Sequence, residues 1–326
     1  MSVKIYNSTY KNLDSISMEN DRMLIKIIPE SGGKLQSIYD KRIRKEYLYQ
    51  SSWTEYRKSE YDSSFLTGEI SGFDEMFPTI VSCYYPDFPW AGTKMPDHGE
   101  VWPLPWEAEL SEEEISLSVY GVRLPYRLEK KIKFSQPDKL RIDYRISNLS
   151  DFPMKFIWAA HPLLNIDEYS TIILPDQVNK VINVMHGAKR LGDYGILHNW
   201  PVTRTADGKE YDMGKLNPSH RDNDKYYVYG CLSKGECALY NEKTRDYIKF
   251  IFPVDKVPYL GVWVNENGPL LNQQNVAVEP CTGALDNINT ADLHGKLSLV
   301  EGKKDYCWFL EIELGEANCG CEVISS

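Results

Sequence analysis

Residues 139–148 read KLRIDYRISN, and this stretch decides the expected fold. Apolar side chains occupy every second position, because Leu140, Ile142, Tyr144 and Ile146 alternate with charged or polar residues. A period of two places one set of side chains on a buried face and the other set in water. The stretch therefore predicts a half-buried β-strand.

The same period recurs along most of the chain. Gly, Pro, Asn and Asp separate the alternating runs and act as turn formers. The composition includes 22 Tyr, 10 Phe and 8 Trp, which are residues that fit a pleated surface. Further runs of this kind are ISLSV, KIKF, TIIL, DYIKFIF, LGVWV and DYCWFLEIEL. Because helical stripes are hard to find, we predict an all-β protein with non-local strand pairing.

Length and charge narrow the class of protein. A chain of 326 residues fits one large β domain, and we expect a single domain over residues 1–326. The net charge is -10, and no block of Lys and Arg marks a nucleic-acid surface. The N-terminal residues do not resemble a leader peptide, and no apolar run has membrane-spanning length. We expect a cytoplasmic protein with neither a nucleic-acid nor a membrane partner, and make no prediction of oligomeric state.

The seven cysteines form an odd set without a CxxC pair. This pattern argues against a disulfide framework and against a structural zinc site. We therefore expect reduced, mostly buried thiols.

Two weakly patterned regions interrupt the alternation. Residues 187–224 are rich in turn formers and predict long surface loops. Residues 50–72 are polar and aromatic, and this region could be a lid or a connection between strands.

Three motifs carry candidate chemistry: PDHGEVW around His98, IWAAHPLLN around His161 and VAVEPCTG around Glu279. Two imidazoles and a carboxylate can move protons near neutral pH. Apolar neighbours predict that burial raises the pKa of Glu279 towards that of a useful base. By itself, His161 also fits a hydrogen-bonded core histidine.

The three motifs, in this order in an all-β chain, resemble the aldose 1-epimerase (galactose mutarotase-like) family. The resemblance spans nearly the whole chain and includes ESGGKLQSIYD, GVRLPYRLEKKIKF and LGVWVNENG. It implies a large antiparallel β-sandwich with few short helices and an open cleft. It also implies interconversion of the α and β anomers of a free monosaccharide, without a cofactor or a metal.

The resemblance assigns a role to each motif residue. Glu279 would remove the proton from the anomeric hydroxyl, and His161 would protonate the ring oxygen as the ring opens. Rotation about the C1–C2 bond and reclosure would then exchange the anomers. His98 would hydrogen-bond the sugar near the same oxygen and steady the developing charge.

The chain departs from the family in the region before the first histidine motif. Many relatives carry an arginine there, whereas this chain reads GFDEMFPTI and offers Asp74 and Glu75 as ligands of sugar hydroxyls. Adjacent residues on a strand point to opposite faces, so at most one of the two should reach the cleft. Sugar-phosphate relatives often carry an arginine a few positions after the HG pair, and its absence at those positions disfavours a phosphorylated hexose.

Three further residues are candidate sugar contacts. Trp102 and Trp263 could stack on a pyranose face, and Trp263 is preferred because LGVWVNENG resembles a family strand. Asp224 resembles a family aspartate that contacts sugar hydroxyls, although a role in a turn fits equally well.

Other functions remain open from the residues alone. His98, Glu100 and His161 follow a pattern that resembles the iron-binding triad of oxygenases on β-scaffolds. Asp74 or Glu75 with Glu279 could form the acid and base of a glycosidase. A carbohydrate-binding protein without catalysis would keep the same pocket.

Overall fold

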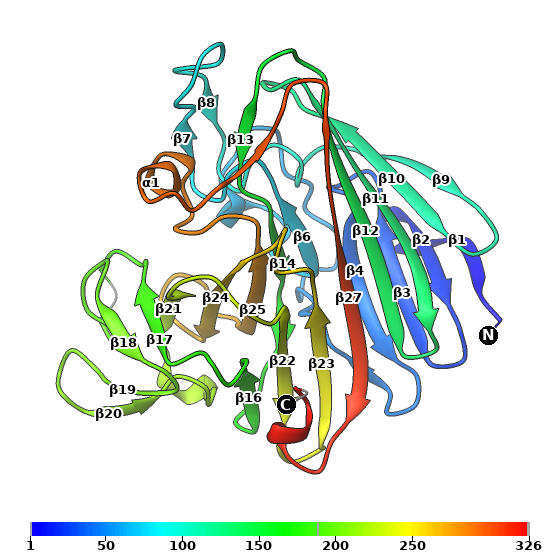
Figure 1. The fold of residues 1–326 in the computed structure, drawn as a ribbon. Helices are drawn as coiled ribbons and strands as arrows, with labels where there is room; N and C mark the ends of the chain where they lie inside the picture. The colour runs from blue at the N-terminus through cyan, green and yellow to red at the C-terminus, as the bar shows by residue number, and fades with distance from the viewer. Residues whose placement is uncertain (1, 188, 325–326) are drawn as a thin grey trace.

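Two large antiparallel sheets carry the fold in the computed structural model, which describes residues 2–187 and 189–324 (Figure 1). Within these residues the first sheet has 13 strands. Its main path is β1 (Lys4–Tyr10), β2 (Leu13–Glu19), β3 (Met23–Ile28), β4 (Lys34–Asp40), β6 (Phe73–Met76), β14 (Ala159–Pro162), β25 (Gln274–Cys281), β24 (Tyr259–Glu266), β21 (Asn223–Val228), β17 (Lys180–Asn183) and β18 (Leu197–Asn199). Two short strands, β5 (Lys45–Glu46) and β15 (Leu164–Asn165), pair with β4 and β25.

The second sheet has eight strands in the described part of the chain. In spatial order they are β16 (Ser170–Ile173), β22 (Glu236–Asn241), β23 (Asp246–Ile251), β27 (Asp305–Glu316), β12 (Lys139–Asn148), β11 (Tyr126–Gln136), β10 (Ile115–Tyr120) and β9 (Glu107–Leu110). Strands β9 to β12 follow one another along the chain, whereas β12 and β27, β23 and β27, and β16 and β22 are distant in sequence. The sheet therefore contains the non-local pairing that was predicted, together with local hairpins.

The remaining elements are short. Three small hairpins or ribbons are β7 (Cys83–Tyr84) with β8 (Lys94–Met95), β13 (Met154–Phe156) with β26 (Ser298–Val300), and β19 (Val202–Arg204) with β20 (Glu210–Asp212). The helical elements are α1 (Ile288–Leu293) and three 3-10 turns, Phe65–Thr67, Pro218–His220 and Gly320–Glu322. None of the helices in the described residues is long and apolar enough to cross a membrane. The prediction of a mostly β protein with few short helices is confirmed.

Strand β12 shows how the sequence pattern becomes packing. Its burial alternates along the strand, with Leu140, Ile142, Tyr144 and Ile146 buried. Tyr144 lies opposite Trp308 on the neighbouring strand β27, and their rings stack with centroids 5.0 Å apart. The inward row of β12 therefore belongs to the core, as its period of two predicts.

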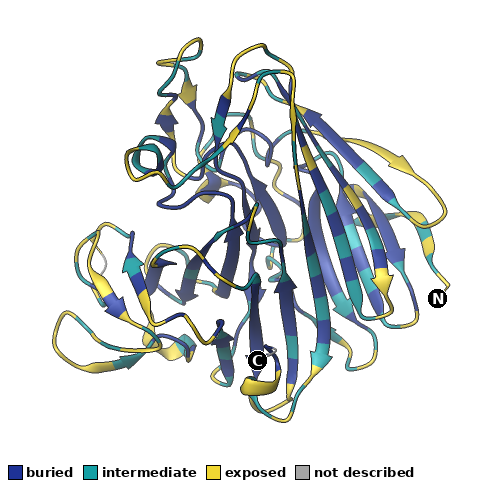
Figure 2. Cartoon of the chain, in the orientation of Figure 1, coloured by how far each residue is buried: buried dark blue, intermediate teal, exposed yellow. Residues whose placement is uncertain are grey.

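The core lies between the facing sides of the two sheets. Glu75 on β6 of the first sheet bonds Lys130 and Tyr144 of the second sheet, so the two faces are in direct contact. The central strands of the first sheet are buried on both sides, and Figure 2 shows them dark blue along their length. One side of these strands faces the core. Loops cover the other side, and the candidate site lies there.

The structure corrects the expectation of reduced thiols at one place. Cys319 and Cys321 form a disulfide beside the last 3-10 turn. The other five cysteines are free, and three of them are buried: Cys83, Cys237 and Cys281. Because the two bonded cysteines are only two residues apart, the bridge closes a small local loop and joins no distant segments.

Candidate active site

Neighbouring strands of the first sheet bring His161 and Glu279 together. Strand β14 lies between β6 and β25, and Ala159 of β14 pairs with Cys281 of β25. His161 lies two residues after Ala159 on β14, and Glu279 lies two residues before Cys281 on β25. Because the strands are antiparallel, the same register places His161 beside Glu279. Their side chains approach to 3.8 Å between His161 Nε2 and Glu279 Oε1.

Glu279 is fully buried and has one free oxygen. Its Oε2 atom accepts a hydrogen bond from the ammonium of Lys225 on β21. Its Oε1 atom has no hydrogen-bond partner among the described residues, and neither has Nδ1 of His161. A buried acceptor without a partner costs folding free energy, and a ligand that donates a hydrogen bond to it would remove this cost.

Gly261 lies close to the contact between Glu279 and Lys225. It lies opposite Glu279 on β24, the strand between β25 and β21. A Cβ at this position would lie 3.1 Å from Glu279 Oε2 and 3.1 Å from the ring of Tyr227. The missing side chain therefore leaves room for the carboxylate to reach across β24.

The environment moves the pKa values of the two groups in opposite directions. Burial raises the pKa of Glu279 above its ordinary value, and the neighbouring Lys225 offsets part of this rise. Burial also lowers the pKa of His161 well below its ordinary value, and electrostatic interactions with His98 and Lys225 lower it further. Burial therefore opposes the charged form of both groups.

His98 faces His161 from a loop. Its φ of 58° lies in the left-handed region, where residues other than glycine are uncommon and functional sites often store strain. Its Nδ1 lies 2.9 Å from Asp97 Oδ1, and its ring stacks on Phe65 with centroids 4.0 Å apart. The His98 and His161 rings lie 5.6 Å apart, so the two imidazoles border one space.

This space is a cavity of about 350 Å³ above the central strands. Its polar lining consists of His98, His161, His186, Lys225 and Asp286. The rest of the lining is apolar, namely Phe65, Leu66, Ile70, Met76, Ile80, Val81, Leu163, Val184, Met185, Trp263, Leu270 and Leu271. Glu279 lies directly beneath, in contact with two of the polar lining residues.

Lys225, Asp286 and Asp97 were not identified from the sequence. Asp286 accepts a hydrogen bond from Tyr227 at 2.6 Å and lies 4.0 Å from Lys225 Nζ. Its φ of 62° is again left-handed. Lys225 directly follows Asp224, so strand alternation was the one signal that could have placed it on the opposite face.

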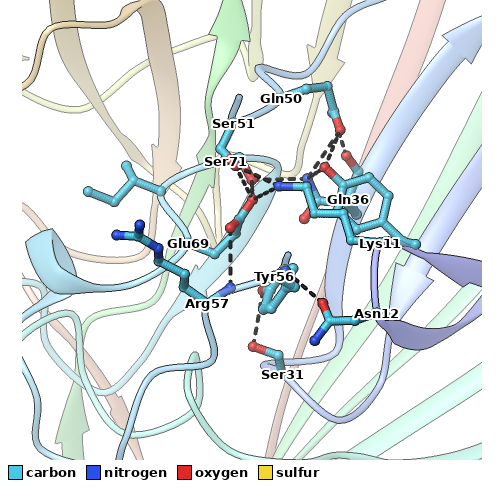
Figure 3. A network of polar contacts seen from close by, with 12 residues as sticks. Lys11, Asn12, Ser31, Gln36, Gln50, Ser51, Tyr56, Arg57, Glu69 and Ser71 are labelled. Atoms are coloured by element: carbon cyan, nitrogen blue, oxygen red, sulfur yellow. Dashed lines mark hydrogen bonds and ion pairs between the residues drawn. The ribbon is translucent and has the colours of Figure 1, made fainter. Parts of the chain in front are cut away.

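A buried polar network fixes residues 50–72 against the first sheet, and Figure 3 shows it with Glu69 at the centre. Glu69 accepts hydrogen bonds from Lys11 at 2.8 Å, Ser51 at 2.6 Å and Ser71 at 3.0 Å. Lys11 belongs to the turn between β1 and β2, so the network ties this segment to distant strands.

A second anchor of the same segment is Tyr56. Its backbone N–H donates to Asn12 at 2.7 Å, and its hydroxyl bonds Ser31 at 3.1 Å (Figure 3). The segment also supplies Phe65, whose N–H donates to Asp97 at 2.9 Å. The segment 50–72 is thus bonded to the first sheet and to Asp97, and it contributes Phe65, Leu66 and Ile70 to the cavity lining.

Among the predicted stacking residues, Trp263 lines the cavity and Trp102 does not. Trp102 is buried behind Phe65, with ring centroids 5.1 Å apart, and its indole N–H donates to the carbonyl of Asp97. The prediction of a sugar contact is corrected for Trp102. Its role is to support Phe65 and the loop that carries His98.

The adjacent carboxylates Asp74 and Glu75 point to opposite faces of β6, as alternation requires. Glu75 lies between the sheets, so its predicted contact with a sugar is corrected. Asp74 lies opposite His161 on the cavity side, but it is buried and forms an ion pair of 3.1 Å with Lys34. Asp74, like Glu279, does not line the cavity, so the pairing of these two carboxylates as acid and base of a glycosidase stays a prediction.

Asp224 is likewise corrected as a sugar contact. Its side chain lies on the face away from the cavity and is held by the guanidinium of Arg190. Arg190 also bonds Glu266 at 2.8 Å. Burial raises the pKa of Asp224 to about 6 in spite of this partner. Arg190 therefore connects the loop that follows β17 to Asp224 and Glu266 of the sheet.

The iron-binding alternative does not fit the geometry. Glu100 turns away from the histidines and accepts hydrogen bonds from Tyr61 at 2.7 Å, Tyr126 at 3.0 Å and the N–H of Arg123 at 2.8 Å. Across residues 2–187 and 189–324, no three side chains of His, Cys, Asp or Glu are grouped as metal ligands would be.

Comparison with known proteins agrees with this architecture. A domain of unknown function (DUF5107) matches residues 3–86, and no curated protein gives a significant match. The Slr1438 protein of Synechocystis sp. PCC 6803 superposes with a TM-score of 0.70 at 18% identity, covering 96% of this chain and 100% of that one.

Two further solved structures carry descriptive names. A galactose mutarotase related enzyme from Lactobacillus acidophilus has a TM-score of 0.64 at 14% identity, covering 93% of this chain and 97% of its own. A galactose mutarotase-like protein from Lactobacillus casei ATCC 334 has a TM-score of 0.61 at 18% identity, covering 92% and 100%. The chain therefore has the galactose mutarotase-like β-sandwich fold, which confirms the resemblance read from its sequence.

Proposed function

We propose that the protein is an isomerase that interconverts the α and β anomers of a free aldose. The observation that carries the proposal is the pair formed by Glu279 and His161. A buried carboxylate oxygen without a hydrogen-bond partner among the described residues lies 3.8 Å from an imidazole that lines the cavity. The cavity volume of about 350 Å³ lies within the usual range for small-molecule sites.

The chemistry needs a net transfer of one proton from the anomeric hydroxyl to the ring oxygen. Glu279 accepts the hydroxyl proton while His161 donates its N–H proton to the ring oxygen, and the C1–ring oxygen bond breaks. Proton transfer across the short gap between the two side chains then restores both groups. Rotation about C1–C2 and the reverse steps give the other anomer, while His98 hydrogen-bonds the ring oxygen as charge develops there.

A second candidate is sugar binding without turnover. One observation favours it: Lys225 already neutralises Glu279, and the carboxylate lies beneath the cavity lining. A carboxylate paired with an ammonium is a weaker base than a free one. The same cavity would then bind the sugar and leave its anomers unchanged.

Polarimetry separates the two candidates. The optical rotation of freshly dissolved α-glucose and α-galactose is followed with wild type, His161→Asn and the exposed control His294→Asn. We expect faster equilibration with wild type and the control on at least one sugar, and a rate lower by about 10²- to 10⁴-fold with His161→Asn. Sugar binding without acceleration by wild type would favour the second candidate.

A further inference from the structure

One carboxylate that lines the cavity has no role in the proposed reaction. Asp286 lies in the loop between β25 and α1 and is only 8% exposed. Its Oδ1 atom accepts a hydrogen bond from the hydroxyl of Tyr227 at 2.6 Å. Its Oδ2 atom has no hydrogen-bond partner among the described residues, and it is not sealed from solvent as Oε1 of Glu279 is. This oxygen therefore opens to the cavity and can accept a hydrogen bond from a ligand.

Tyr227 holds this carboxylate in one orientation. Burial raises the pKa of Tyr227 well above its ordinary value, and the charge of Asp286 raises it further, so the phenol keeps its proton and donates it. Gly261 on the neighbouring strand leaves space for the phenol ring, because a Cβ there would lie 3.1 Å from it. Oδ1 of Asp286 is thereby committed to Tyr227, and Oδ2 remains for a ligand.

The backbone that carries Asp286 is strained and firmly bonded. Leu285 and Asp286 have φ values of 74° and 62°, so two consecutive residues adopt the left-handed region that leucine seldom occupies. The carbonyl of Asp286 accepts hydrogen bonds from the N–H groups of Ile80 at 3.0 Å and Val81 at 2.8 Å. Both of these residues line the same cavity. Such strain costs stability and is concentrated at ligand sites, which favours a functional reason for the position of this carboxylate.

Lys225 connects Asp286 to the reactive end of the cavity. Its ammonium donates a hydrogen bond to Oε2 of Glu279 and lies 4.0 Å from Oδ1 of Asp286. The two carboxylates therefore flank the same ammonium. Because a pyranose carries several hydroxyls around one ring, a sugar whose anomeric hydroxyl meets Glu279 can present another hydroxyl to Asp286.

We propose that Asp286 is a specificity-determining residue, which accepts a hydrogen bond from one hydroxyl of the substrate other than the anomeric hydroxyl. This inference rests on the proposed function and adds a feature that the substrate must carry. A site built around a hydrogen bond rejects an analogue that lacks the bonded hydroxyl, because its own polar group is then left unpaired. Deletion of this hydroxyl should lower affinity and kcat/KM by about 10- to 100-fold.

Deletion of single hydroxyls from the sugar, combined with a variant of Asp286, tests the inference. The 2-, 3-, 4- and 6-deoxy analogues of D-glucose and D-galactose are compared with their parent sugars by calorimetric binding and by the rate of anomer exchange. Asp286→Gly removes the carboxylate, and glycine suits the positive φ at this position. One analogue should lose about 10- to 100-fold with wild type but less than about threefold with Asp286→Gly. Equal penalties with both proteins for every analogue would overturn the inference.

Two further variants complete the test. Asp62→Gly is the matched control, because Asp62 also has a positive φ, of 64°, and does not line the cavity, so its hydroxyl preferences should equal those of wild type. Asp286→Asn keeps an oxygen for Tyr227 and places the amide NH₂ where Oδ2 was, in a backbone conformation that asparagine tolerates. Its preference for the same hydroxyl should weaken several-fold, because the charged acceptor is lost. An unchanged preference in Asp286→Asn would contradict the role given to Oδ2.

The outcomes for the inference and for the proposed function are distinct. Accelerated exchange with equal hydroxyl penalties in wild type and Asp286→Gly would reject the role of Asp286 alone. A penalty in binding that depends on Asp286, without accelerated exchange, would reject the isomerase and keep the role of Asp286. If neither parent sugar nor any analogue binds, both proposals fail.

Discussion

Glu75 and Glu279 are both buried glutamates of the first sheet, and each pairs with a lysine, yet their surroundings differ. Glu75 faces the core, where Lys130 at 2.9 Å and Tyr144 at 3.0 Å bond one oxygen. The indole of Trp158 bonds the other oxygen at 2.8 Å. Glu279 faces the cavity side, where Lys225 bonds one oxygen and the other has no hydrogen-bond partner within the described part of the chain.

This difference separates a structural ion pair from a candidate functional one. A buried charge with all its hydrogen bonds made contributes to a defined packing arrangement. A buried carboxylate with an unused oxygen beside an imidazole costs stability and leaves that oxygen available to a ligand. We therefore expect changes at the Glu75 cluster to affect folding and changes at Glu279 to affect chemistry.

The largest expected effect is on stability, at Lys130. Lys130→Met leaves the buried charge of Glu75 without its ionic partner, so the free energy of unfolding should fall by about 3–5 kcal/mol in urea denaturation. Lys131→Met is the matched control, because this neighbour is 57% exposed and should change stability by less than about 0.5 kcal/mol. Similar stability of the two variants would show that the Glu75 cluster is not structural.

The next prediction concerns the pH dependence of activity. Burial raises the pKa of Glu279 above 4.5, and the base must be ionised, so kcat/KM should fall with decreasing pH at a midpoint above 4.5. Lys225 favours the ionised carboxylate and lowers its pKa. Lys225→Met should therefore move the midpoint to higher pH, with about tenfold less activity at low pH for each unit of movement.

Lys225→Arg serves as the control for this shift, since it keeps the positive charge beside Glu279. Its pH midpoint should stay closer to that of wild type. If the pH midpoint of kcat/KM does not move in Lys225→Met, the fall in activity at low pH reports the ionisation of a group other than Glu279.

The smallest expected effect compares two tryptophans of one aromatic cluster. Trp158 donates to Glu75, whereas the indole nitrogen of Trp308 is buried without a partner among the described residues. Trp158→Phe should lower the free energy of unfolding by about 1–3 kcal/mol more than Trp308→Phe. Equal losses in denaturation experiments would show that the hydrogen bond to Glu75 adds nothing beyond packing.

Local periodicity predicted much of the fold. Alternation in KLRIDYRISN placed Tyr144 and its neighbours on the core face, because a strand has only two faces. Alternation also required the side chains of Asp74 and Glu75 to point to opposite faces of their strand. The sequence did not reveal which of these two carboxylates points into the core, since that depends on pairing with strands distant in the chain.

The candidate site was only partly predictable for the same reason. The motifs identified His98, His161 and Glu279, but Lys225 was overlooked in favour of its neighbour Asp224. The burial of Lys130 could have been predicted, because it occupies an inward position between Leu128 and Ile132 on its strand. A buried lysine requires a buried partner. The identity of that partner needed the contact between the two sheets.

The most direct test compares Glu279→Gln with Glu75→Gln by measuring anomer exchange and unfolding free energy on both proteins. We predict that Glu279→Gln loses about 10²- to 10⁴-fold in exchange rate per folded molecule, in addition to any stability lost with its ion pair to Lys225. Glu75→Gln should lose about 3–5 kcal/mol and retain its exchange rate per folded molecule. Undiminished exchange in Glu279→Gln would contradict the account.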